Sequence, residues 1–218
     1  MSELPVFPLD VVVFPGMTIP VSVSEERYKR LVKLVLAQPQ EPKRFIVAMA
    51  GDDAAIRDTP VRIARFGTLV NVLSVEETED GFDLLVHGQE RYEVAVSRVE
   101  QVAEAGGATR PLLFAQGTPA PVARSDPNAE AIAAWDAVDT FRDYAKTLFK
   151  LDTAADIDVH LPQDPLYQAS FVCANIRVPA ASKQPLLEAP SLTERFDLAR
   201  DLMLRRLERK PRSRRGSA

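Results

Sequence analysis

The first half of the chain alternates short apolar runs with turn residues, a pattern typical of β-strands. In FDLLVHG, Phe82, Leu84 and Val86 fall on one face, and RYEVAV repeats this alternation, so both segments have a side suited to burial. Asp80-Gly81 predicts a hairpin turn, because glycine adopts the positive φ that such turns need. The predicted strands are Val11–Phe14, Arg44–Ala50, Val61–Val75, Phe82–Val86 and Arg91–Val99. We therefore expect an antiparallel sheet.

One helical pattern interrupts this half, in the segment SVSEERYKRLVKLVLAQP. Its apolar residues recur at helical spacing: Tyr28, Leu31, Val32, Val35 and Leu36. Ser22 and Glu25 have the spacing of a capping box, and Pro39 is expected to end the helix. Five or six strands with one covering helix predict a small, partly closed β-barrel, since closure removes exposed strand edges.

The second half changes to helical spacing after the Gly- and Pro-containing segment QGTPAPVARSDP. Asp126-Pro127 and Asp164-Pro165 are typical helix starts, an N-cap side chain followed by a proline at the first helical position. Ser191 and Glu194 form another capping box, and a shorter helix is expected at Lys183–Glu188. The apolar positions of the longest helix are Ile132, Trp135, Val138, Phe141, Ala145 and Leu148. This half is predicted to be a helical bundle.

The predicted organisation is thus α+β, which 218 residues are enough to build as one large domain or two small ones. We expect a barrel subdomain over 1–116, a linker over 117–125, a helical bundle over 126–210 and a basic tail over 211–218. The N-terminus lacks the basic region of a signal peptide, and no run approaches the roughly 18 apolar residues of a membrane span. We therefore expect a cytoplasmic protein without a membrane partner.

Charge separates the end of the chain from the rest. The net charge is −4, without the overall positive field of a dedicated nucleic-acid binder. The final RRLERKPRSRRGSA is strongly basic. It is interpreted either as a solvated helix end or as a contact for nucleic acid or an acidic partner.

The residues that usually carry catalysis do not form a recognisable motif. The sequence has no GxxxxGK[ST] loop, no GxSxG elbow and no HExxH pair. His87 and His160 have no matched nucleophile, and the single cysteine, Cys173, stands among apolar residues of a predicted helix. We expect no enzyme activity, no catalytic residue, no metal site and no cofactor.

The stretch VVVFPGMTIP sets apolar residues around a Pro-Gly turn, and its candidate site residues are Phe14, Pro15, Met17, Ile19 and Pro20. One interpretation buries them as core, as is usual for apolar residues near a sheet. The other makes them a shallow surface for unfolded segments, because methionine-containing surfaces repack around varied partners. A sheet edge that accepts an extended peptide is a second physical route to binding.

The opening of the chain resembles the start of the N-terminal domain of Lon proteases. The residues that carry the resemblance are Leu4, Pro5, Pro8, Leu9, Val11 to Met17 and Pro20. Further matches follow in the family's order: Gly67, Thr68, Asp80, Gly81, Gly88, Arg91, Lys183-Gln184, Leu186-Leu187 and Glu194-Arg195. Asp10 departs from the pattern, where many relatives have Arg, and Pro185 lies inside the expected short helix. Without a nucleotide loop or serine-lysine dyad, the sequence resembles a stand-alone form of this domain.

The resemblance implies a barrel related to RNA-binding PUA domains, a helical bundle and recognition of protein substrates. The favoured function is a non-catalytic module whose partners are unfolded or damaged polypeptide segments. Two alternatives stay open: a nucleic-acid-binding PUA-like protein, and a regulator that docks onto a full-length Lon-type ATPase. The substrates and the oligomeric state are not indicated by the sequence.

Overall fold

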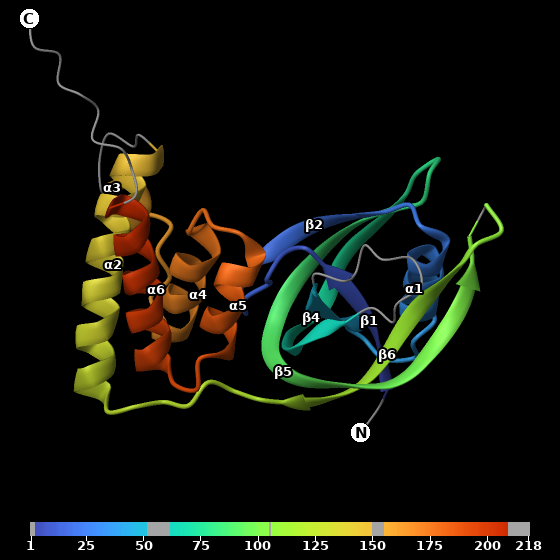
Figure 1. The fold of residues 1–218 in the computed structure, drawn as a ribbon, viewed down its shortest axis with the longest axis horizontal. Coiled ribbons are helices and arrows are strands. Elements are labelled where there is room, and N and C mark those ends of the chain that lie inside the picture. The colour runs from blue at the N-terminus through green and yellow to red at the C-terminus, as the bar shows by residue number, and fades with distance from the viewer. Residues whose placement is uncertain (1–2, 52–61, 105, 150–154, 209–218) are drawn as a thin grey trace, which may run out of the picture. The chain divides into compact units, whose positions relative to one another are not determined.

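The computed structural model describes residues 3–51, 62–104, 106–149 and 155–208, which fall into two compact units (Figure 1). The first unit is drawn from Met1–Val122 and Val178–Glu188, and the second from Ala123–Arg177 and Ala189–Ala218. The first contains the strands, and the second is helical.

The strands are β1 (Glu3–Leu9), β2 (Thr18–Val23), β3 (Arg44–Ala50), β4 (Ile63–Glu77), β5 (Phe82–Ala103) and β6 (Thr109–Pro119). The helices are α1 (Glu26–Leu36), α2 (Pro127–Phe149), α3 (Ala155–Asp158), α4 (Pro165–Asn175), α5 (Ala180–Glu188) and α6 (Leu192–Glu208). The chain is therefore an α+β protein, as predicted.

The strands form one sheet in the order β2-β5-β4-β3-β1-β6. Strand β6 also pairs with β5, so a continuous circuit of pairings runs through β5, β4, β3, β1 and β6, with β2 attached to β5. All pairs are antiparallel except β1 with β3. Helix α1 packs against β1, β5 and β6, and its residues Leu31 and Val35 join Phe7, Phe45 and Val86 in the core. The helix thus covers one face of the sheet.

The strands differ from the predicted ones in several places. The hairpin at Asp80-Gly81 is confirmed, since the backbone N–H of Thr78 donates to the carbonyl of Gly81 over 2.9 Å. Its expected cause was wrong, because Gly81 does not adopt a positive φ; a Cβ there would instead clash with the carbonyl oxygen of Val23. The two runs predicted after the hairpin are one 22-residue strand, β5. Val11–Phe14 is not a strand, so that prediction was wrong, and the strands are β1 and β2 on either side of it. Strand β6 was not predicted.

Helix α1 begins without the predicted capping box. Its N-cap residue, Glu25, makes no side-chain cap, and Ser22 lies in β2. The carboxylate of Glu104, beyond the end of β5, accepts the backbone N–H of Glu26 at 3.1 Å and of Arg27 at 3.4 Å. A distant side chain therefore satisfies the first amides of α1, which local spacing could not predict.

The second unit begins its helices as predicted. The side chain of Asp126 accepts N–H groups of the first turn of α2, and Asp164 does the same for α4. The hydroxyl of Ser191 accepts the N–H of Glu194 at the start of α6. Ile132 and Trp135 differ from the prediction, because each is 65 % exposed instead of facing the bundle.

Helix α5 belongs to the first unit, although its sequence neighbours belong to the second. It packs against β3 and β4, and the side-chain amide of Gln184 donates to the carbonyl of Phe66 in β4 over 3.0 Å. It begins at Ala180, three residues earlier than predicted, and contains Pro185. The sequence grouped this segment with the helical half because its partners in the sheet are remote in the chain.

Candidate functional site

The candidate stretch divides into a buried part and an exposed part. Phe14 and Pro15 are buried, Met17 and Ile19 are half-buried against the core of the first unit, and Pro20 is exposed. The segment 14–20 therefore runs from the interior of the first unit to its surface.

The turn in this segment is fixed by bonds to β5. Gly16 has a φ of 88°, a backbone conformation in which a residue with a side chain would be strained. Its N–H donates to the carbonyl of Gly88, and the N–H of Gly88 donates to the carbonyl of Met17, both over 2.8 Å. The backbone N–H of Phe14 lies 3.1 Å from the Met17 sulfur. The Met17 side chain is thus folded back over its own turn and is partly withdrawn from solvent.

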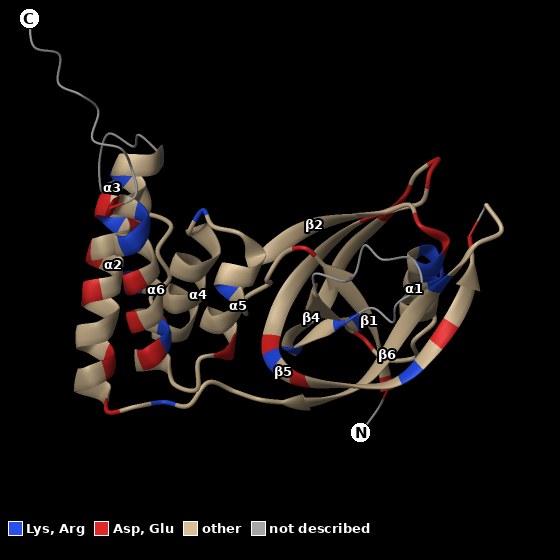
Figure 2. Ribbon diagram, in the orientation of Figure 1, with Lys and Arg blue, Asp and Glu red and all other residues tan. Residues whose placement is uncertain are grey.

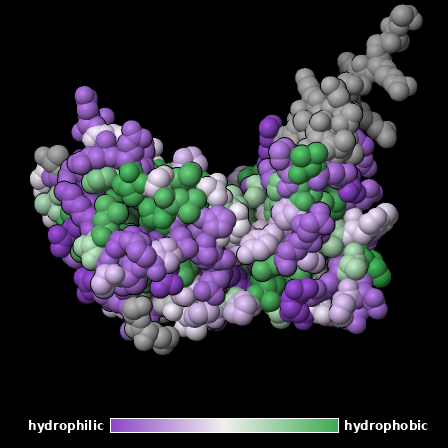
Figure 3. Space-filling model, turned by 180° about the vertical axis from the view of Figure 1, so that it is seen from behind, coloured by the Kyte–Doolittle hydropathy of each residue, from purple (hydrophilic) through white to green (hydrophobic). Residues whose placement is uncertain are grey.

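The register extends the exposed part onto neighbouring strands. Leu85 of β5 lies opposite Pro20 and is 37 % exposed. On its other side Leu85 pairs with Ser74 of β4, next to Leu73, which is 56 % exposed at a register shift. We call Pro20, Leu85 and Leu73 the outer patch. Figure 3 shows hydrophobic side chains gathered on part of the surface of this unit.

Sequence reasoning missed Leu85, although a signal for it was present. In FDLLVHG the alternation assigns Asp83, Leu85 and His87 to the solvent face. Asp83 and His87 suit that face, and the Nδ1 atom of His87 lies 2.9 Å from the hydroxyl of Thr18. A single exposed leucine is common, but Leu85 adjoins Pro20 and Leu73 in the register, and adjoining exposed apolar residues mark a contact surface.

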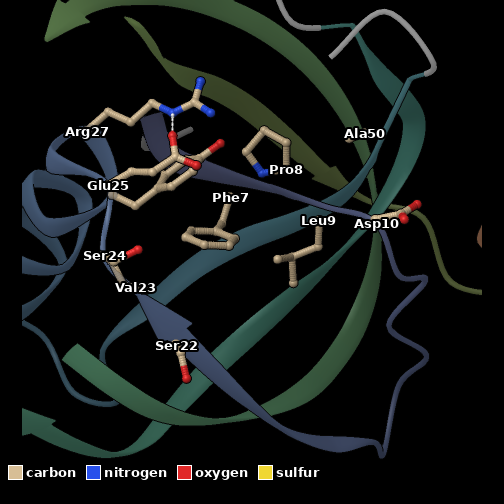
Figure 4. Close-up of a pocket in the computed structure, with 11 residues that line it drawn as sticks. Phe7, Pro8, Leu9, Asp10, Ser22, Val23, Ser24, Glu25, Arg27 and Ala50 are labelled. Atoms are coloured by element: carbon tan, nitrogen blue, oxygen red, sulfur yellow. Dashed lines mark hydrogen bonds and ion pairs between the residues drawn. The ribbon is translucent and has the colours of Figure 1, made fainter. Parts of the chain in front are cut away.

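A hollow of about 300 Å³ lies between the end of β1 and the end of β2 (Figure 4). Phe7 and Leu9 of β1 point toward the side on which β2 lies, and Val23 of β2 and Tyr28 of α1 complete much of the lining. No residue of β5 lines it, although β5 is the strand that pairs with β2. The hollow therefore lies on the other side of β2.

Two of the charged residues that line this hollow, Glu25 and Arg27, are paired, and the third, Asp10, is exposed. Glu25 lies 2.9 Å from the Nε atom of Arg27 and 3.1 Å from the Nη1 atom of Arg110. The Arg27 guanidinium lies 4.3 Å from the centre of the Tyr28 ring, a cation–π arrangement. Burial raises the pKa of Tyr28 to about 12, so its hydroxyl is neutral at physiological pH.

Positive charge gathers on α1, beside the end of β5 (Figure 2). Lys29 lies 2.9 Å from Glu26, and Arg30 pairs with Glu100. Lys29 and Arg30, which lie beside Lys33, are therefore each paired with a carboxylate. This pairing weakens the case for nucleic-acid binding at this surface, because phosphate groups bind to unpaired cations. The basic tail predicted at 211–218 lies outside the described residues.

The remaining candidate side chains are accounted for structurally. Cys173 is buried in α4, as the sequence predicted for a small apolar residue. Across residues 3–51, 62–104, 106–149 and 155–208, no group of three His, Cys, Asp or Glu side chains is placed to hold a metal ion. Within the same ranges no helix has the length and apolar character to span a membrane.

The six-stranded sheet and the helices define an α+β protein of the Lon N-terminal domain type. The chain belongs to the family of the ATP-dependent protease La (LON) substrate-binding domain, whose model matches residues 3–205. The resemblance seen in the sequence is therefore confirmed across nearly the whole chain.

Relatives and solved structures agree with this membership. The Lon protease of Xanthomonas oryzae pv. oryzae is 35 % identical over 206 residues, which cover 90 % of this chain and 22 % of that protein. The Lon protease of Escherichia coli K12 is 26 % identical, over 92 % of this chain and 24 % of that protein. This chain thus spans less than a quarter of the length of these relatives.

The N-terminal domain of Mycobacterium avium complex Lon protease has the same fold, with a TM-score of 0.68 and 19 % identity. The match covers 93 % of this chain and 98 % of that one. A Lon N-terminal domain protein from Xanthomonas campestris gives a TM-score of 0.57 at 20 % identity, over 90 % of this chain and 96 % of that one. The fold is thus that of Lon N-terminal domains.

Proposed function

We propose that this chain is a non-catalytic module that binds unfolded polypeptide segments through the outer patch. The observation that carries the proposal is that Leu85 and Leu73 are exposed on strands whose alternate residues form the core. In this proposal Pro20, Leu85 and Leu73 make the contact, with Met17 and Ile19 at its border. Phe14 and Pro15 support the turn from inside.

The chemistry of the patch suits recognition of many sequences. An unfolded chain exposes apolar side chains that a folded protein hides, and their burial is favourable without fixed geometry. The half-buried thioether of Met17 is flexible enough to adapt to different side chains. Binding of this kind is weak, promiscuous and little affected by salt, because few charges take part.

We further infer that the circuit of strand pairings is the partly closed, PUA-like barrel expected from the sequence. The second pairing of β5, with β6, supports this inference. Family membership supports a cytoplasmic role connected with a Lon-type protease. It favours protein substrates over nucleic acid.

Fluorescence anisotropy tests the proposal directly. The probe is labelled α-lactalbumin, either native or reduced and carboxymethylated so that it stays unfolded. We expect saturable binding of the unfolded probe alone, and about tenfold weaker binding by Leu85→Asp, since burial of a leucine contributes roughly 1.5 kcal/mol or more.

The matched control is Leu204→Asp on α6, the same substitution at a leucine of similar exposure, 43 % against 37 %. This control should bind as the wild type does. If both substitutions weaken binding equally, or if the wild type binds neither probe, the proposed function is wrong.

A further inference from the structure

Strand β2 has one edge that is paired and one that is not. Ile19, Val21 and Val23 lie opposite Val86, Leu84 and Phe82 of β5. In an antiparallel pair, alternate residues direct their backbone groups to the partner strand and the residues between them direct theirs away. Pro20 has no N–H to donate, which fits a position whose backbone points away from β5.

The outward backbone groups of β2 therefore belong to Thr18, Pro20 and Ser22. All three residues are exposed, and within the described residues no backbone hydrogen bond joins them to another strand. The edge thus offers N–H groups at Thr18 and Ser22, and carbonyls at Thr18, Pro20 and Ser22. Alternating donors and acceptors at this spacing are complementary to the backbone of an extended polypeptide.

The hollow described above adjoins this same edge. Ser22 and Val23 line it on one side, and Phe7 and Leu9 of β1 line it on the other. The C-terminal part of β1 is paired with β3, but its pairing with β6 ends at Val6. The space beside Phe7 and Leu9 is therefore not taken by another strand of the described chain.

The geometry points to strand addition: an unfolded segment pairs its backbone with the outer edge of β2 and places one apolar side chain in the hollow between β2 and β1. This inference rests on the proposed function and names how the segment is held. Backbone pairing accepts any sequence except at prolines, and the hollow adds a preference for an apolar residue. The outer patch then contacts side chains on the other face of the added strand.

The lining of the hollow has an apolar part and a polar part. Phe7 and Tyr28, with ring centres 4.3 Å apart, form the apolar part together with Leu9 and Val23, and the polar part includes Asp10, Ser22 and Ser24. Glu25 is paired with two arginines, so it does not require a cation from the bound segment. An aromatic or long aliphatic side chain would contact the apolar part of the lining.

The substitution Ser22→Pro tests the backbone contact. It removes the outward N–H of Ser22, and Pro20 shows that β2 accommodates proline at an outward position two residues earlier. Ser22→Ala is the matched control, because it removes the side chain and keeps the N–H. With reduced, carboxymethylated α-lactalbumin as the probe, we expect binding roughly fivefold weaker for Ser22→Pro, the effect of one lost hydrogen bond, and unchanged for Ser22→Ala.

Amide hydrogen exchange in the wild-type protein gives a second readout that does not depend on the variant folding. With the probe bound, the amides of Thr18 and Ser22 should exchange about fivefold more slowly. The amide of Val21, already bonded toward β5, should change little.

The outcomes separate the two claims. Binding by the wild type with unchanged exchange at Thr18 and Ser22 overturns strand addition and leaves the proposed function standing. Equal weakening by Ser22→Pro and Ser22→Ala also overturns it, because the side chain would then be responsible. Absence of binding by the wild type contradicts the proposed function and strand addition together.

Discussion

Replacing Arg91 with methionine should loosen α5 from the sheet. Arg91 is 6 % exposed, and its guanidinium donates to the carbonyls of Ala120, Pro121 and Leu187. The same group lies 4.9 Å from the centre of the Phe66 ring. One side chain on β5 thus holds both the segment after β6 and the last turn of α5.

The size of the effect follows from these contacts. A hydrogen bond from a charged donor contributes roughly 1.5 to 3 kcal/mol, and three carbonyls lose such a donor in Arg91→Met. Burial lowers the pKa of Arg91, with Glu188 opposing that shift, so keeping the charge there has an energetic cost that the substitution removes. We therefore expect a net loss of about 3 kcal/mol in the free energy of unfolding of the first unit.

Urea denaturation followed by circular dichroism measures this loss. In Arg91→Met, amide hydrogen exchange should also be faster throughout α5 than in the wild type. The matched control is Arg98→Met on the same strand. Arg98 also lies over a ring, 3.6 Å from the centre of Phe114, but its side chain is 47 % exposed, so its substitution should cost about 1 kcal/mol or less. An Arg91→Met loss no larger than that of Arg98→Met, or unchanged amide exchange in α5, would show that Arg91 does not hold α5 on the sheet.

Three further substitutions test other parts of the account. Gly16→Ala should cost about 1 kcal/mol in urea denaturation because φ is 88° there, and an unchanged midpoint would mean that the turn relaxes. Glu104→Gln should cost about 1 kcal/mol and speed amide exchange at the start of α1, since its carboxylate accepts those N–H groups; unaltered exchange would contradict this role. Arg124 and the Ser125 N–H hold the pKa of Glu130 below 4.5, so the stability it contributes is present above that pH and is lost as the pH falls through the lowered value. Denaturation at a series of acid pH values should show a shallower decline for Glu130→Gln, and an identical decline would reject this assignment.

Features set by neighbouring residues were predictable from the sequence. The helix starts at Asp126 and Asp164 depend on side chains within a few residues, so their patterns sufficed. The hairpin at Asp80-Gly81 was located correctly, although Gly81 is required there by the close approach of Val23 and not by a positive φ. The burial of Cys173 followed from its apolar neighbours.

Features that depend on distant partners were not predictable. The pattern of Val11–Phe14 predicts a strand, but this segment is a largely buried connection between β1 and β2. The hydroxyl of Thr68, 55 residues away in β4, donates to its Val13 carbonyl. The cap on α1 comes from Glu104, and α5 finds its partners in β3 and β4. Local patterns carry no information about such contacts, which the tertiary fold decides.

The candidate site was predictable in its location but not in its membership. The Pro-Gly turn drew attention to the right segment, and Pro20 is exposed there. Phe14 and Pro15 proved to be buried, while Leu85 and Leu73 join Pro20 only through the register of β2, β5 and β4. Sequence spacing does not fix which exposed residues of three strands become neighbours.

Methyl NMR of the leucine-labelled protein, titrated with reduced, carboxymethylated α-lactalbumin, locates the surface that binds the unfolded chain. We expect saturable chemical-shift changes concentrated at the methyl groups of Leu85 and Leu73. The methyl resonances of two exposed leucines elsewhere, Leu34 on α1 and Leu204 on α6, should not shift. Shifts at Leu34 or Leu204 without shifts at Leu85 and Leu73 would contradict binding at the outer patch.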